Sequence, residues 1–176
     1  MVVFRRTVGL ITENSKEYTK TILEDEIKGL ETIFYKDVSK DEFEKVCDTI
    51  ESMIENSRKE ISKQIRELLL SYAQFVAHTG IRPGTEMEEI CWGDIEIRRE
   101  EELVQFIVKV RKGKTTKHTG TRTVVCFTDI WEVLDDLRER FPNRKPQDKV
   151  FVLANGDETL QLSNNFKMAL EKCGLK

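Results

Sequence analysis

The chain has 176 residues, of which 39% are hydrophobic and 35% are charged, with a formal net charge of −3 at pH 7. This length suits one domain, or one domain with a helical appendage, and it allows a sizeable core. The composition argues against disorder, against a membrane span, which needs about 18 to 20 consecutive apolar residues, and against a simple polycationic nucleic-acid binder.

The N-terminal half of the sequence has the apolar spacing of helices. A first helix is predicted over about 23–34, where apolar residues recur every three or four positions. Ser39 and Glu42 form a capping-box pattern at the start of a second helix. A third helix is predicted over about 60–78. Gly80 breaks its pattern, and Pro83 suits the first turn of a short helix ending near Cys91.

From Trp92 onward the sequence predicts strands and then helices again. Strands are expected at 94–98, 103–110 and 121–127, and the last two form a hairpin with its turn in 113–120. A helix from Asp129 to about Arg140 follows, then a short strand at 150–153. Ser163 is expected to cap a last helix that ends at Gly174. The predicted fold class is therefore α+β, mainly helical with a small three-stranded antiparallel sheet.

Charge is unevenly distributed along the chain. Residues 24–60 carry twelve acidic and six basic side chains, whereas 109–122 carry six basic side chains and no acidic one. A basic segment on an otherwise acidic protein indicates a focused anion site. The alternative is a solvated hairpin whose lysines only prevent edge-to-edge pairing of strands.

The cysteines and histidines do not predict a metal site. The four cysteines include no Cys-x-x-Cys pair, and the two histidines do not complete a zinc spacing. We expect reduced, buried thiols in a cytoplasmic protein without metal or cofactor, since the N-terminus also lacks the features of a secretion signal.

The stretch from Thr79 to Ile95 resembles the first arginine box of the tyrosine recombinases, the phage-integrase family. It reads Thr-Gly-Ile-Arg-Pro-Gly-Thr-Glu, followed by Ile-Cys-Trp-Gly-Asp-Ile. The order of elements also agrees with that family, so the resemblance covers about 39–176. It implies a partial catalytic domain at 39–176, preceded by a helical segment or linker at 1–38. One residue is inserted between Arg82 and Glu86 relative to the family pattern.

The resemblance implies roles for particular residues in breaking and rejoining DNA through a 3′-phosphotyrosyl link, without a metal or cofactor. Arg82 would stabilise the charged transition state at phosphorus, and Glu86 would orient Arg82. The alternative for Arg82 is an ordinary salt bridge with Glu86 or Glu89. Lys114, or alternatively Lys117, would act as general acid on the leaving 5′-oxygen. Four further residues would contact the phosphate backbone of double-stranded DNA: Arg111, Lys112, His118 and Arg122.

The family's second box, with His-x-x-Arg, and its tyrosine nucleophile have no counterpart here. Tyr18, Tyr35 and Tyr72 all precede the arginine box. We therefore expect a truncated catalytic domain of a prokaryotic mobile-element or phage integrase, inactive and monomeric alone. Its full-length parent would assemble as a tetramer on DNA and associate with the nucleoid. The alternatives are a non-catalytic DNA-binding or regulatory remnant of an integrase, or an unrelated helical interaction module.

Overall fold

A computed structural model describes residues 39–100, 103–113, 120–126 and 130–175. This part of the chain has five α-helices and a three-stranded antiparallel sheet, so the predicted α+β class is confirmed. The predicted helix at 23–34 lies outside the described residues. The elements in chain order are α3 (Lys40–Glu55), α4 (Glu60–Thr79), α5 (Thr85–Glu88), the 3₁₀ helix η2 (Trp92–Asp94), β1 (Ile95–Glu100), β2 (Leu103–Val110), β3 (Arg122–Cys126), α7 (Trp131–Arg140) and α8 (Leu162–Cys173).

The predicted helix caps at Ser39, Gly80 and Gly174 are confirmed. The Ser39 hydroxyl accepts the backbone N–H of Glu42 at 3.2 Å, and the Glu42 carboxylate accepts the N–H of Ser39 at 2.8 Å. This reciprocal box satisfies two backbone donors that the start of a helix leaves free. Gly80 and Gly174 end α4 and α8 with φ values of 66° and 74°, a left-handed conformation that glycine adopts without strain.

Two helix starts within the described residues differ from the predictions, and the predicted start of α7 at Asp129 lies outside the described residues. Helix α5 begins at Thr85, because Pro83 and Gly84 form a turn and Gly84 has a φ of 89°. Helix α8 begins at Leu162, so Ser163 lies in its first turn and does not cap it. In both cases a side chain suited to a helix start lies one or two residues from the observed boundary, where backbone geometry decides the position.

The predicted strand at 150–153 is wrong. The segment is buried at Val150, Phe151 and Leu153, but it belongs to no strand, and the described part of the chain shows only an isolated bridge beside it, between Cys91 and Lys149. The N–H of Val150 donates to the Ile90 carbonyl, and that of Leu153 donates to Asp157 in the following turn. Apolar character therefore reflects core packing here, not membership of a sheet.

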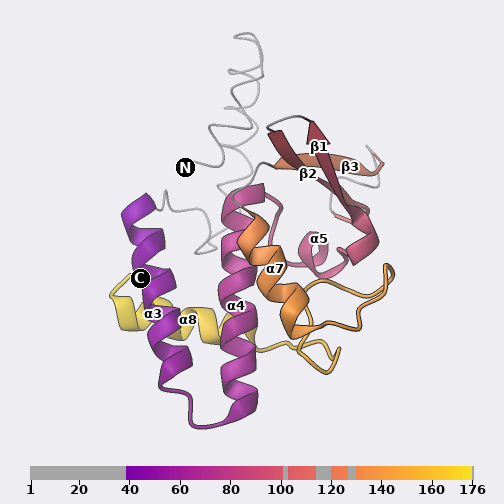
Figure 1. Cartoon of the computed structure of the whole chain (residues 1–176). Coiled ribbons are helices and arrows are strands. Elements are labelled where there is room, and N and C mark those ends of the chain that lie inside the picture. Colours follow the sequence, from indigo (N-terminus) through magenta and orange to yellow (C-terminus); the bar gives the residue numbers. More distant parts are fainter. Residues whose placement is uncertain (1–38, 101–102, 114–119, 127–129, 176) are drawn as a thin grey trace.

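Helix α4 is the centre of the molecule, because it contacts α3, α7, α8 and strand β3 (Figure 1). Its buried residues divide between two apolar clusters. Ile65, Leu68 and Phe75 join the larger cluster, which includes α7, the inner face of the sheet and the 150–153 segment. Leu69 joins a smaller cluster with α3 and α8. The larger cluster supports the segment that carries the candidate site.

The sheet has the order β1-β2-β3 with antiparallel pairing throughout, as predicted for the hairpin. Residues that alternate along β2 and β3 line the buried face: Phe106, Val108 and Val110 on β2, and Val124 and Cys126 on β3. In the β2–β3 register Val110 lies opposite Arg122, so this arginine stands at the end of the strand pair that leads into the hairpin.

Candidate functional site

The backbone around Arg82 is anchored to helix α4 from both sides. The N–H of Ile81, a residue that is 1% exposed, donates to the Thr79 hydroxyl at 3.2 Å. The N–H of Gly84 donates to the Tyr72 hydroxyl at 2.9 Å. Arg82 itself is exposed, and its guanidinium has no ion-pair or hydrogen-bond partner among the described residues. The loop therefore holds, on a fixed backbone, a guanidinium that no described side chain neutralises.

Glu86 is a buried carboxylate beneath this loop, with only 4% of its surface exposed. Its Oε2 atom accepts the backbone N–H of Arg82 at 3.3 Å. The same atom lies 2.5 Å from Nη2 of Arg122. We predicted that Glu86 orients Arg82, and the contact is made through the backbone of Arg82 while the side-chain partner is Arg122.

Arg122 reaches Glu86 because of its position in the alternation of β3. Side chains two residues apart in a strand share a face, so Arg122 shares the buried face with Val124 and Cys126. Its side chain remains 36% exposed, so the guanidinium spans from the buried carboxylate to solvent. The family resemblance predicts only a phosphate contact for Arg122. The alternation of apolar residues along β3 is the sequence signal that predicts Arg122 on the buried face, near Glu86.

Gly113 allows the hairpin to approach Glu86 closely. A Cβ atom at this position would lie 2.6 Å from Oε1 and 2.7 Å from Cγ of Glu86. Any larger residue would have to displace the carboxylate or the strand end. A glycine shortly after β2, the first strand of the hairpin, is thus needed for the contact between the hairpin and the segment that carries Arg82.

Arg111 and Lys112, which stand between β2 and Gly113, are each paired with a carboxylate. Nε of Arg111 lies 2.5 Å from Oδ1 of the buried Asp94, a charge contact without hydrogen-bond geometry. Nζ of Lys112 donates to Glu89 at 2.7 Å, and this bond is the main reason why the pKa of Glu89 lies below its usual value. These pairs neutralise much of the positive charge that the sequence concentrates in 109–122.

Glu89 also links the hairpin to the loop before the 150–153 segment. Nζ of Lys149 lies 3.6 Å from Glu89 and 2.8 Å from Glu158, and the hydrogen bond to Glu158 is the largest cause of the raised pKa of Lys149. The alternative that Arg82 forms an ordinary salt bridge with Glu86 or Glu89 does not hold within the described residues, because both carboxylates bind other cations.

Three predicted site residues lie outside the described residues: Lys114, Lys117 and His118. The structure therefore does not distinguish Lys114 from Lys117. Tyr72 has a structural role, since its hydroxyl holds Gly84 and its ring packs edge-on against Phe151 at 5.2 Å. Burial raises the pKa of Tyr72, which disfavours the ionised form that a nucleophile needs.

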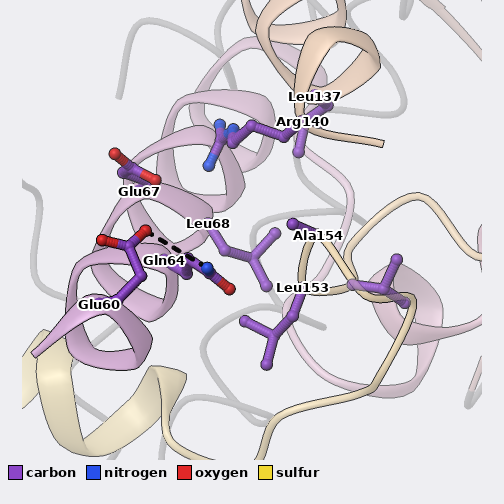
Figure 2. A pocket seen from close by; sticks show the side chains of 9 residues that line it. Glu60, Gln64, Glu67, Leu68, Leu137, Arg140, Leu153 and Ala154 are labelled. Carbon is purple, nitrogen blue, oxygen red and sulfur yellow. Dashed lines mark hydrogen bonds between the residues drawn. The ribbon is translucent and has the colours of Figure 1, made fainter. Parts of the chain in front are cut away.

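A cavity of about 170 Å³ lies away from this site, between α4, α7 and the 152–154 segment (Figure 2). Its lining residues are Glu60, Gln64, Glu67, Leu68, Leu137, Arg140, Val152, Leu153 and Ala154. The polar groups already have partners: Gln64 donates to Glu60 at 3.3 Å, and Arg140 binds Asp136 and the Ser71 hydroxyl. The cavity contains none of the predicted site residues.

Further features of the described residues are the potential metal ligands, the apolar character of the helices and the cysteines. Within the described ranges, no group of three or more His, Cys, Asp or Glu side chains is arranged to hold a metal ion. No helix in the same ranges has the length and apolar character needed to cross a membrane. Cys47, Cys126 and Cys173 are buried free thiols, as predicted, and Cys91 is half-buried.

In the described structure, the arginine-box segment and the base of the basic hairpin meet at one buried carboxylate. Arg82 and Arg122 each contact Glu86, with Gly113 packed against it. Arg122 balances the charge of Glu86, and the exposed guanidinium of Arg82 has no carboxylate partner among the described residues, so its charge can serve an oxyanion such as a phosphate. Neither a protein-family model nor a curated protein matches this chain.

Proposed function

We propose that this protein binds the phosphate backbone of double-stranded DNA and forms part of the catalytic domain of a tyrosine recombinase. The observation that carries the proposal is the shared carboxylate, because Glu86 accepts both the backbone N–H of Arg82 and the guanidinium of Arg122. Two separate segments of the chain carry the sequence resemblance: the loop with Arg82 and the hairpin. Their meeting at Glu86 supports a common site.

In this proposal Arg82 is the phosphate ligand. Its guanidinium is exposed and has no carboxylate partner among the described residues, so its N–H donors remain available for two phosphate oxygens. Removing a preorganised donor of this kind from a transition state typically costs about 3–4 kcal/mol, or about 10²–10³ in rate. Arg122 adds a second positive charge that Glu86 holds in place.

The hairpin would supply the general acid. Lys114 is the next residue in the chain after Gly113, which packs against Glu86, and Lys117 is the alternative. A lysine that protonates the leaving 5′-oxygen contributes about 10²–10⁴ in rate. The tyrosine nucleophile of this chemistry would come from sequence other than Tyr72, because that hydroxyl is held by Gly84.

DNA binding would compete with the internal ion pairs. Arg111 and Lys112 bind Asp94 and Glu89 in the free protein, so their contacts with phosphates require these pairs to open or to be shared. Arg82 needs no such exchange. We therefore assign Arg82 the largest contribution to affinity among the described basic residues of the site.

The test is a titration of a labelled duplex with the whole chain, followed by fluorescence anisotropy at several salt concentrations. With about three phosphate contacts, log K should fall with log salt with a slope of about −2.7. Arg82→Gln should weaken binding by about 10-fold or more and reduce the slope by about 0.9. Arg99→Gln, which removes an exposed arginine from β1, is the matched control and should bind like the parent.

Each outcome discriminates between the alternatives. Binding that is insensitive to Arg82→Gln but is lost in Arg122→Gln would favour the non-catalytic DNA-binding remnant. No salt-dependent affinity in the parent chain would overturn both nucleic-acid proposals and favour the helical interaction module.

A further inference from the structure

A second group of basic residues lies around Trp92, at the junction of η2, α7 and the loop 141–149. The guanidinium of Arg144 stands 4.7 Å from the centroid of the Trp92 ring, and that of Arg138 stands 5.9 Å from it. Arg138 also lies 5.5 Å from the ring of Trp131. All four side chains are half-buried. Two cations therefore share one indole ring at the edge of the larger core.

The backbone fixes Trp92 against the loop that carries Arg144. The N–H of Trp92 donates to the Asp148 carbonyl at 3.0 Å, and the N–H of Gly93 donates to the Pro146 carbonyl at 2.7 Å. A Cβ on residue 93 would lie 2.9 Å from that carbonyl oxygen, so the close approach depends on glycine. The ring and the loop consequently form a fixed frame for the two arginines.

These two positive charges are not balanced by carboxylates. Neither Arg138 nor Arg144 has an acidic side chain within ion-pair distance among the described residues, in contrast to Arg111, Lys112 and Arg122. Arg144 donates through Nη1 to the carbonyls of Arg138 and Phe141, at 3.3 and 3.4 Å. Its remaining donors stay available.

The two guanidinium groups are close enough to affect each other. Burial, followed by the positive charge of Arg144, lowers the pKa of Arg138, and Asp135 opposes this effect. Cation–π contact with Trp92 and Trp131 offsets part of the repulsion. A bound anion would offset the rest, and both guanidinium side chains are half-buried and so retain contact with solvent.

We propose that Arg138 and Arg144, mounted on Trp92, form a binding site for a phosphate dianion, such as inorganic phosphate or a terminal phosphate group. The two negative charges of the ligand match the two positive charges of the guanidinium groups. A phosphate also offers more acceptor oxygens than a carboxylate does. Two planar forks of N–H donors can bind three or four oxygens around one centre. A carboxylate would balance only one of the two charges. The site involves neither Arg82 nor the hairpin, so it does not rest on the proposed function.

The test uses the intrinsic fluorescence of the whole chain, which has two tryptophans, Trp92 and Trp131. A Trp131→Phe background isolates the signal of Trp92. Potassium phosphate at about pH 7.5, where the dianion dominates, is titrated against potassium chloride at matched ionic strength. We expect a saturable change with phosphate and none with chloride, because phosphate draws the guanidinium groups away from the ring.

Variants assign the response to the two arginines. Arg138→Gln and Arg144→Gln should each weaken phosphate binding by about 10-fold or more, since each removes charge-assisted hydrogen bonds. Arg99→Gln again serves as the matched control and should leave the response unchanged. Equal responses to phosphate and chloride, equal affinity for acetate, or an unchanged response in Arg144→Gln would each overturn the proposal.

A second measurement covers the case in which a glutamine variant folds poorly. Phosphate should raise the melting temperature of the parent in a saturable manner, and Arg144→Lys, which keeps the charge but loses the fork, should gain less. An equal gain in Arg144→Lys would contradict a site built on the fork. Competition by a 5′-phosphorylated but not a 5′-hydroxyl duplex would identify a nucleic-acid end as the source of the phosphate, and competition by neither would identify a free phosphate compound.

Discussion

Glu86 shows how a single side chain can organise the candidate site. It is buried, it accepts a backbone N–H from the loop that carries Arg82, and it binds the guanidinium of Arg122. A buried carboxylate without partners would be costly, and its two partners come from segments that are far apart in the sequence. Glu86 therefore connects the arginine-box loop to the hairpin.

Replacing this carboxylate tests the connection at the scale of one residue. Glu86→Gln keeps the shape but removes the charge that faces Arg122. We expect a loss of about 1–3 kcal/mol in the free energy of unfolding, below the value for a fully buried pair because Arg122 is partly exposed. Urea unfolding followed by circular dichroism measures this loss as a lower midpoint at constant slope.

The control for Glu86→Gln is Glu96→Gln. Glu96 also pairs with an arginine, Arg98 at 2.9 Å, but both side chains of that pair are about half exposed. An exposed pair contributes little, so this variant should unfold at the same urea concentration as the parent. Equal losses in the two variants would contradict a special role for Glu86.

At the scale of elements, the hairpin docks on α5 by way of Gly113. The absence of a side chain there lets the strand end lie directly against the Glu86 carboxylate. The residues of the buried face of β3 then bring Arg122 to the same point. Docking therefore depends on Gly113, which follows β2, and on the alternation of side chains along β3, which places Arg122 on the buried face.

Gly113→Ala should separate these elements. The added methyl group would overlap Glu86, so we expect a loss of about 1–3 kcal/mol in stability. In a Glu86→Ala background the same change should cost less, with a coupling energy of about 0.5–3 kcal/mol in the double-mutant cycle. Additive losses in the cycle would show that Gly113 acts on something other than Glu86. Thr123→Ala, at an exposed position of β3, provides the control.

At the scale of the whole molecule, α4 joins two apolar clusters. Its neighbouring residues Leu68 and Leu69 point into different clusters, and Leu162 on α8 packs against both. Because one rigid helix belongs to both clusters, loss of packing in one should weaken the other. We expect the described elements to unfold in a single transition.

Ile50→Ala provides the test of this coupling. Ile50 is fully buried in the smaller cluster, so the substitution should cost about 2–5 kcal/mol. Both tryptophans pack against the larger cluster. The unfolding midpoint measured by their fluorescence should nevertheless fall by the same amount as the midpoint measured by far-ultraviolet circular dichroism. Separate midpoints for the two signals would show that the clusters unfold independently.

Helices, strands and caps followed from the sequence because they depend on local spacing and local chemistry. The capping box at Ser39, the glycine ends of α4 and α8, and the hairpin of β2 and β3 were all predicted from residues close together in the chain. The 150–153 segment was predicted wrongly, since an apolar run is equally suited to a strand and to a buried loop.

Local sequence patterns are sufficient to predict the fold class, most element limits and the candidate residues Arg82 and Glu86. Which charges pair depends on the folded arrangement: Glu86 pairs with Arg122, Asp94 with Arg111, and Glu89 with Lys112. It also brought Arg138 and Arg144 together on Trp92, from segments about 50 residues away in the chain. The physical reason is that ion pairs and cation–π contacts require proximity in space, which the packing of β3, α7 and the 141–149 loop on one core provides and which no local spacing encodes.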